Sequence, residues 1–157
     1  MSDMQSKSLI EPKSKNLIFI HEEAMQLINS YRQSQPTDCE AGGLLIGKRR
    51  GPHFEITAAT PPQSDDLRSR YQFVRFEDGH QQLAQALWSA SNCEDTYLGE
   101  WHTHPEDLPT PSSLDLKEWK KAGKRHQEIL IFIIVGIQSN YYTLLTSQGY
   151  LCLKEYS

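Results

Sequence analysis

Apolar positions along the chain recur at two spacings, the alternation typical of strands and the three-to-four-residue spacing of amphipathic helices. Alternating or continuous apolar runs predict strands over residues 17–20, 42–49, 53–59, 71–75, 96–104, 128–135, 140–147 and 150–155. Helical spacing predicts helices over residues 22–32, 79–91 and 112–123. Helices mixed with a largely sequential set of strands predict an α/β (α+β) domain built on a sheet.

Turn-forming and polar residues separate these elements. The Arg-Gly-Pro segment 50–52 lies between two strands and predicts a β-hairpin. The polar segment 61–70 is expected to be a loop, and the prolines of segment 105–111 predict a rigid one. Residues 1–15 are expected to form a flexible N-terminal arm, which leaves residues 16–157 as a single domain.

Size and charge narrow the classes of function. The 157 residues suffice for one compact domain with its own core. Sixteen Lys and Arg against 20 Asp and Glu give a net charge of −4, which argues against a nucleic-acid binder held by phosphate contacts. The longest apolar run, Ile129–Val135, is much shorter than the roughly 18 residues of a membrane-spanning helix, and the first 15 residues lack the apolar core of a signal peptide. We therefore expect a cytoplasmic protein that binds neither membrane nor nucleic acid.

The cysteines Cys39, Cys93 and Cys152 are widely spaced and odd in number. They form no C-x-x-C pair, so neither a disulfide framework nor a thiolate zinc site is indicated. A cysteine nucleophile would need an activating base beside it and is the less favoured alternative.

Two of the six histidines stand one residue apart in the segment Glu-Trp-His-Thr-His-Pro, residues 100–105. On a strand, residues i and i+2 face the same side, so His102 and His104 can direct two imidazoles at one point, whereas Thr103 faces the other side and is expected to pack. Pro105 donates no backbone hydrogen bond, so the strand should end there and leave the pair at its tip. Two solvated or packed histidines are the simpler alternative.

Ser112 follows His102 by ten residues. Together, Ser112 and Asp115 have the pattern of a helix N-cap and its acidic partner, close to a capping box. Capping alone explains the pair, but a helix start would also fix the Asp115 carboxylate beside the strand tip. Two imidazoles and one carboxylate make a three-ligand set suited to zinc, with the fourth position left for water as in catalytic sites. Iron bound by the same types of ligand is the alternative.

A metal-dependent hydrolase also needs a general base near the metal. Glu100, Glu106 and Asp107 are near the histidines in sequence. Glu40 lies farther away and opens the apolar, glycine-bearing segment 40–47, where a carboxylate is costly to bury unless it has a partner. A strand-edge glutamate without a catalytic role is the alternative for Glu40.

The residues singled out so far resemble the signature of the JAB/JAMM (MPN-plus) metalloprotease family: Glu40, His102, His104, Pro105, Ser112 and Asp115. The segment 40–47 is similar to the base-bearing strand of the bacterial branch of this family. The resemblance implies a JAB/MPN-like fold, with a curved, mixed β-sheet flanked by helices, and a Zn²⁺ cofactor. It further implies that His102, His104 and Asp115 bind the zinc. By the same resemblance, Glu40 is the base and Ser112 helps to stabilise the tetrahedral intermediate.

Segments 99–105 and 111–115 are most similar to small single-domain bacterial members, the deconjugating peptidases of type II CBASS antiphage operons. This resemblance implies an isopeptidase that hydrolyses the bond after the C-terminus of a ubiquitin-like conjugated protein, a CD-NTase joined to a target lysine. Such an enzyme would be encoded beside an E1–E2-like fusion protein. The alternatives are a JAB protease that processes a sulfur-carrier protein of the ThiS/MoaD kind and a non-catalytic MPN scaffold.

The implied substrate is a protein with an extended C-terminal tail, because a flexible tail can reach a metal at a strand tip. An extended tail can add a strand beside an exposed sheet edge. Segments 63–70 and 105–111 are expected to wall the groove that holds this tail, although a solvated loop is an equal alternative for segment 63–70.

Overall fold

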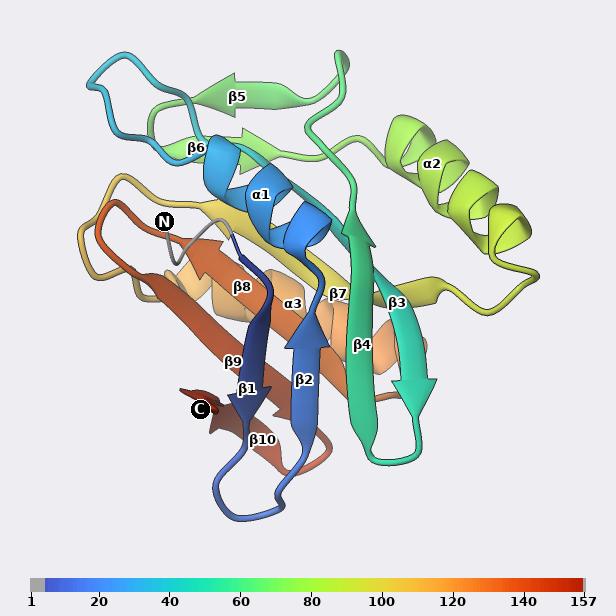
Figure 1. Ribbon diagram of the computed structural model, residues 1–157. Coiled ribbons are helices and arrows are strands. Elements are labelled where there is room, and N and C mark those ends of the chain that lie inside the picture. The colour runs from blue at the N-terminus through green and yellow to red at the C-terminus, as the bar shows by residue number, and fades with distance from the viewer. Residues whose placement is uncertain (1–4, 157) are drawn as a thin grey trace.

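The computed structural model describes residues 5–156, apart from the side chains of Glu77 and Asp78 (Figure 1). Within this range the strands are β1 (Lys7–Ile10), β2 (Leu17–Ile20), β3 (Gly42–Arg50), β4 (His53–Ala59), β5 (Leu67–Ser69), β6 (Gln72–Val74), β7 (Thr96–Thr103), β8 (Leu130–Val135), β9 (Asn140–Thr146), β10 (Gly149–Cys152) and β11 (Lys154–Glu155). The helices are α1 (Glu22–Ser30), α2 (Glu77–Ala90) and α3 (Ser113–His126). No helix in the described range is both long and apolar enough to span a membrane.

The larger sheet is mixed and strongly curved. Its strand order is β10-β9-β8-β7-β3-β4-β2-β1-β11, and β5 and β6 form a separate two-stranded sheet. The pairs β2–β4 and β7–β8 are parallel, and the other pairs are antiparallel. Strands β10 and β11 lie at opposite ends of the order, yet only Leu153 separates them in the chain, so the sheet curls until its two edges meet. The expected α+β fold with a curved, mixed sheet and flanking helices is confirmed.

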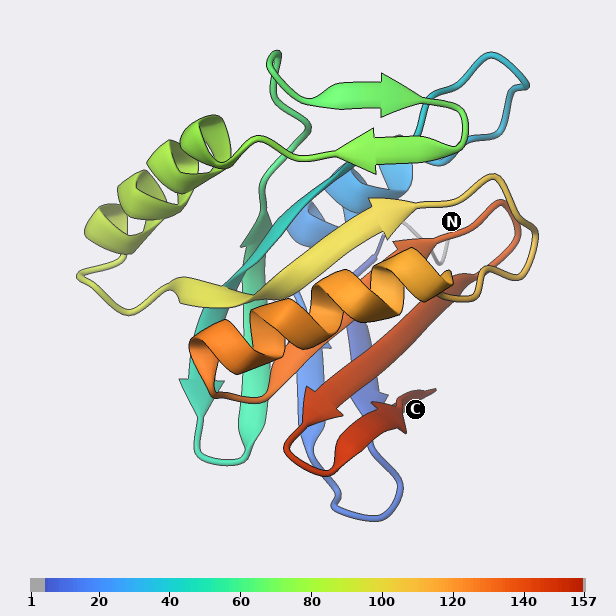
Figure 2. The same ribbon diagram turned by 180° about the vertical axis from the view of Figure 1, so that it is seen from behind.

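Both faces of the sheet are covered near its centre, and β8 is buried throughout. Ile131 and Ile133 belong to the core cluster that includes α1, whereas Phe132 and Ile134 pack with Trp119 of α3. Alternate residues of a strand face opposite sides, so the apolar run of β8 places α1 on one face and α3 on the other (Figures 1 and 2). Because His102 is paired with Ile134, its side chain lies on the α3 face.

The expected flexible arm over residues 1–15 is wrong where the structure describes it. Lys7–Ile10 forms β1, which pairs with β2 on one side and β11 on the other, and Leu9 is fully buried. A four-residue strand with only one fully buried side chain shows too little alternation to be recognised in the sequence. Residues 1–4 lie outside the described part of the chain.

Two other element predictions also need correction. The segment 61–70, expected to be a loop, contains β5, all of whose side chains are exposed, so that no apolar pattern marks it. The expected strand 150–155 is split into β10 and β11, which pair with different neighbours. The remaining predicted elements are present, with ends shifted by a few residues.

Candidate active site

Strand β7 carries two histidines to one end of the sheet. The strand ends at Thr103, and the N–H of His104 donates a hydrogen bond to the carbonyl of Val135 at the end of β8 (3.0 Å). The Nε2 atoms of His102 and His104 lie 3.0 Å apart. The sequence prediction that the two imidazoles point toward one place therefore agrees with the structure.

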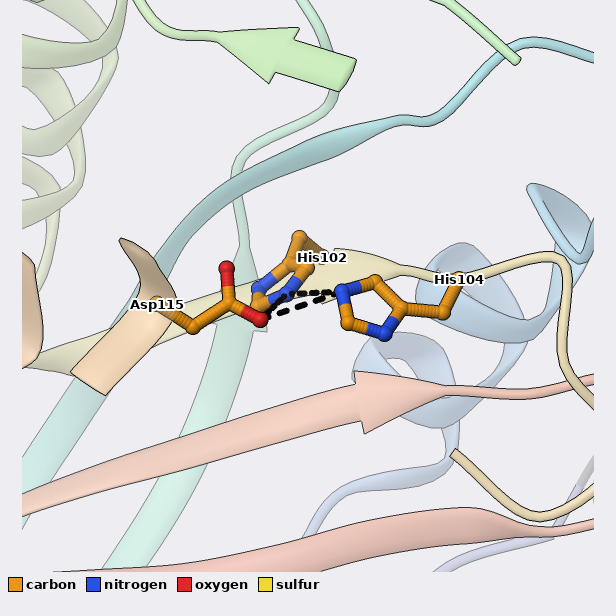
Figure 3. Close-up of side chains that lie close together, drawn as sticks. All are labelled: His102, His104 and Asp115. Carbon is orange, nitrogen blue, oxygen red and sulfur yellow. Dashed lines mark hydrogen bonds and ion pairs between the residues drawn. The ribbon is translucent and has the colours of Figure 1, made fainter. Parts of the chain in front are cut away.

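Asp115 is brought to these histidines by the start of α3. Ser112 is the N-cap: its Oγ accepts a hydrogen bond from the N–H of Asp115 (3.0 Å), and its own N–H donates to Asp115 Oδ2 (2.8 Å). The same Oδ2 lies 3.2 Å from His102 Nε2 and 3.1 Å from His104 Nε2 (Figure 3). The capping box and the convergence with the histidines thus occur together.

The three donor atoms suit a small tetrahedral cation. They lie within 4.8 Å of one another, and no other group of three such donors occurs among the side chains that the structure describes. Atoms bound at about 2.0–2.2 Å from one zinc ion at tetrahedral angles lie about 3.3–3.6 Å apart, close to the separations of 3.0, 3.1 and 3.2 Å found here. Two imidazoles and a carboxylate are also donors that zinc accepts readily. The residues therefore fit a zinc ion.

The charges within the cluster are strongly coupled. Burial lowers the pKa of His104, but hydrogen bonds to Asp115 and Glu106, together with the charges of Asp115 and Glu40, outweigh burial and raise this pKa to about 9. Burial raises the pKa of Asp115, yet the hydrogen bonds from His102 and His104 hold it well below the usual range of a carboxyl. The site therefore stabilises positive charge beside the Asp115 carboxylate.

Glu40 lies in the same cleft and is only 7% exposed. Burial raises the pKa of its carboxyl to about 7; the charge of His104 opposes this shift, and the charges of Asp115 and Glu106 add to it. A carboxyl with a pKa near neutrality can both accept and release a proton at neutral pH.

The backbone around Glu40 is held from two sides. On one side, its N–H donates to the carbonyl of Ser69 (2.6 Å), and its carbonyl accepts from Nε of Arg68 (2.9 Å), both in β5. On the other side, Thr103 Oγ1 accepts a hydrogen bond from the N–H of Ala41 (2.9 Å), and the N–H of Thr103 donates to the Ala41 carbonyl (2.9 Å). Thr103 is fully buried and faces away from the histidines, so it joins the strand that carries them to the segment that carries Glu40.

The cleft around these residues has a volume of about 650 Å³. Its walls come from β6, from the residues that follow β7, and from the first turns of α3; they include Phe73, Val74, Pro105, Glu106, Leu114 and Glu118. The expected wall at segment 63–70 is wrong, because the lining runs through the neighbouring residues 71–75 instead. Gly42 permits this arrangement, since a Cβ there would lie 2.8 Å from the Phe73 ring.

The family model Prok-JAB, described as prokaryotic homologs of the JAB domain, matches residues 24–146. The chain belongs to this family. Three curated proteins named CD-NTase/cGAS isopeptidase are similar to this JAB-family chain. The one from Pseudomonas aeruginosa is 40% identical over 138 residues, 87% of each chain. The one from Escherichia coli is 46% identical over 121 residues, 77% of each, and the one from Vibrio cholerae is 34% identical over 134 residues, 85% of each.

Among solved structures, the JAB-family chain is similar to protein DSY2949 from Desulfitobacterium hafniense, determined in solution. The TM-score is 0.56 and the identity 24%, and 88% of each chain is covered. At this identity the likeness supports the shared fold alone.

In this JAB-family site, His104 has a side-chain partner that the sequence pattern did not identify as such. The sequence makes Glu106 a candidate base, but in the structure its Oε1 lies 2.8 Å from Nδ1 of His104. Glu100 instead accepts a hydrogen bond from Tyr97 (2.9 Å) and pairs with Arg75. Asp95, which precedes β7, does not contact the histidines and pairs with Lys48 (2.8 Å). The position of Glu106 two residues after His104 was the feature of the sequence that could have indicated this contact.

Proposed function

We propose that this JAB-family chain is a zinc-dependent isopeptidase that hydrolyses the bond after the C-terminus of a CD-NTase conjugated to another protein. The observation that carries the proposal is the convergence of His102, His104 and Asp115 in one cleft with the buried carboxyl of Glu40. The relatives named CD-NTase/cGAS isopeptidase support both the bond type and the substrate.

In this proposal His102, His104 and Asp115 hold the zinc ion. When bound, the ion supplies Lewis acidity, which polarises a carbonyl and lowers the pKa of water. Glu106 holds Nδ1 of His104, which leaves Nε2 directed at Asp115 and available as a ligand. Glu40 is the general base: its carboxylate takes a proton from the attacking water and passes it to the leaving lysine amine.

Ser112 is assigned the role of stabilising the oxyanion of the tetrahedral intermediate with its hydroxyl group. Its Oγ already accepts a hydrogen bond from the N–H of Asp115, so the hydroxyl hydrogen remains available to donate. The residue lines the cleft beside Asp115. A donor fixed in advance by a helix cap stabilises developing negative charge without reorganising during the reaction.

The extended tail of the substrate is proposed to lie between β6 and the start of α3. Strand β6 pairs with β5 on one side, and its residues line the cleft. A tail that adds a strand to β6 gains main-chain hydrogen bonds with little demand on its own side chains. This mode admits an unfolded tail and excludes a folded loop, which is the selectivity that a deconjugating enzyme requires.

We extend the proposal to the cellular setting. An E1–E2-like fusion protein, encoded in the same antiphage CBASS operon, forms the conjugate in the cytoplasm. This chain reverses that reaction. The partner of the enzyme is then the conjugate itself, recognised through the CD-NTase tail.

The test is to incubate a purified CD-NTase conjugate with the zinc-loaded enzyme and to weigh the products by intact mass spectrometry. We expect two intact proteins, the CD-NTase with a free C-terminal carboxylate and the target with an unmodified lysine. The isosteric variant Glu40→Gln is the control and should leave the conjugate intact. Cuts scattered through either protein would contradict the proposal. So would an intact conjugate alongside efficient trimming of a ThiS-like precursor, or an intact conjugate with zinc at full occupancy.

A further inference from the structure

A second cavity, larger than the catalytic cleft, lies on the other side of α3. It is a groove of about 1040 Å³ between α3 and the β9–β10 hairpin, which lie close together in Figure 2. We call it the α3 groove and define it by Leu116, Lys120, Gly123, Lys124, Leu145 and Tyr150. The α3 residues that line it differ from those that line the catalytic cleft, so the helix separates two hollows.

The floor of the α3 groove is apolar, and a glycine lets it lie close to the helix. Leu145 and Ile129 lie in it, and Gly123 stands in the interior of α3, where glycine is a poor helix former. A Cβ at residue 123 would lie 2.8 Å from Cδ2 of Leu145. The helix therefore places no side chain over the floor at this point.

The rim of the groove is basic. Lys117, Lys120 and Lys124 line it, all three are exposed, and none forms an ion pair with any residue in the described range. The one acidic lining residue, Glu128, is paired with Arg49 (2.9 Å). Lys121, on another side of the same helix, is paired with Glu118 (3.4 Å). Three unpaired lysines over an apolar floor, in a chain whose net charge is −4, concentrate positive charge at this place.

The groove also begins close to the candidate active site. Leu116 and Lys117 directly follow Asp115, and the hydroxyl of Tyr150 donates a hydrogen bond to the Leu116 carbonyl (3.1 Å), so one end of the groove is joined to the helical turn that supplies Asp115. A protein whose tail occupies the cleft can therefore reach the groove with its folded part.

We propose that the α3 groove is a second binding site for the protein conjugate, one that accepts an acidic segment with apolar side chains outside the tail. This inference rests on the proposed isopeptidase function. The apolar floor favours a protein segment over a nucleic-acid backbone, and the lysines complement acidic side chains. Apolar anchoring supplies affinity, whereas the charges select and steer the partner.

The test compares two substrates. One is the full CD-NTase conjugate, and the other is a short CD-NTase tail peptide joined to lysine by an isopeptide bond. In the triple variant Lys117→Glu, Lys120→Glu, Lys124→Glu, we expect KM for the conjugate to rise at least about tenfold with kcat within about twofold, while both constants for the peptide stay unchanged. Lys121→Glu, on the same helix but outside the groove, is the matched control and should behave as wild type.

Raising the KCl concentration should raise KM for the conjugate in the wild type and much less in the triple variant, because salt screens exposed charges. Equal kinetics of wild type and triple variant on the conjugate would overturn the inference, and so would equal losses on conjugate and peptide. A wild type that is dimeric when the triple variant is monomeric would assign the groove to a second copy of the chain. Single-stranded DNA that binds the wild type but not the triple variant would assign the groove to nucleic acid. Either result overturns the inference. If the wild type cleaves neither substrate, the proposed function itself has failed.

Discussion

Two clusters among the described residues combine histidine with aspartate, and they differ in how their polar atoms are satisfied. In the first, His80 Nδ1 lies 2.8 Å from Thr60 Oγ1 and His80 Nε2 lies 2.7 Å from Asp66 Oδ2, with all three residues buried. In the second, Nε2 atoms of His102 and His104 face each other and the same oxygen of Asp115.

The first cluster is a closed chain in which each donor has an acceptor. Thr60 Oγ1 accepts the N–H of Leu44 (2.7 Å) and contacts Nδ1 of His80, and Nε2 of His80 donates to the Asp66 carboxylate, which can only accept. Asp66 also accepts the N–H groups of Gln63 and Phe76, both at 2.8 Å. Such a saturated chain fixes the segment that bears β5 and β6 and has no vacant position for an ion.

In the second cluster, the facing atoms of two imidazoles and a carboxylate compete for the same space. Each imidazole nitrogen there carries either a lone pair or one N–H. Hydrogen bonds alone therefore cannot satisfy both nitrogens and the carboxylate oxygen equally well. A cation at their centre satisfies all of them together. The arrangement of lone pairs, more than the presence of histidine and aspartate, therefore separates a set of metal ligands from a structural hydrogen-bond chain.

The largest effect we expect is on turnover at the second cluster. Glu40→Gln keeps the shape of the side chain but removes the group that accepts a proton, so kcat should fall by about 10²–10⁴-fold. Zinc content and melting temperature should stay near wild-type values, because Glu40 is not among the three converging donors. Steady-state cleavage of the tail peptide measures this. Full activity of Glu40→Gln with an inactive Glu100→Gln would place the base on β7.

The next effect concerns stability at the first cluster. His80→Ala leaves Thr60 and Asp66 buried without their partner, and we expect a loss of about 2–4 kcal/mol in the free energy of unfolding. In metal-free protein, His102→Ala should lose at most about half as much, because this side chain borders an open cleft. Urea denaturation of both variants gives the comparison. A greater loss for His102→Ala would remove the structural distinction between the clusters.

The smallest effect is on metal affinity. Glu106→Gln weakens the hydrogen bond that orients His104, and zinc affinity should fall by about 10–100-fold. The neighbouring Asp107→Asn is the control and should leave the affinity unchanged. Competition with a chromophoric chelator measures both variants. Unchanged affinity in Glu106→Gln would show that Glu106 does not orient the ligand.

The sequence predicted the parts of the site that depend on local geometry. His102 and His104 share a side of one strand because their spacing is two, and the capping box at Ser112 and Asp115 is set by a spacing of three. Glu40 could be connected to them only through the family resemblance, because the two strands pair across about sixty residues, with Gly42 opposite His102.

The contacts of the first cluster could not be predicted from the sequence. Thr60, Asp66 and His80 lie on a strand end, a loop and a helix, and no spacing rule joins them. Strand β1 was not predicted for a different reason. Its place in the sheet depends on its pairing with β2 and β11 on either side, rather than on its own apolar pattern.

We expect the second cluster, and not the first, to bind a metal ion, and zinc stoichiometry distinguishes the two. Elemental analysis by mass spectrometry should find one zinc per wild-type chain after reconstitution and dialysis, and one per chain in His80→Gln. His102→Ala, His104→Ala and Asp115→Ala should each retain much less than one. Full zinc in any of these three variants, or loss of zinc in a folded His80→Gln, would contradict the account.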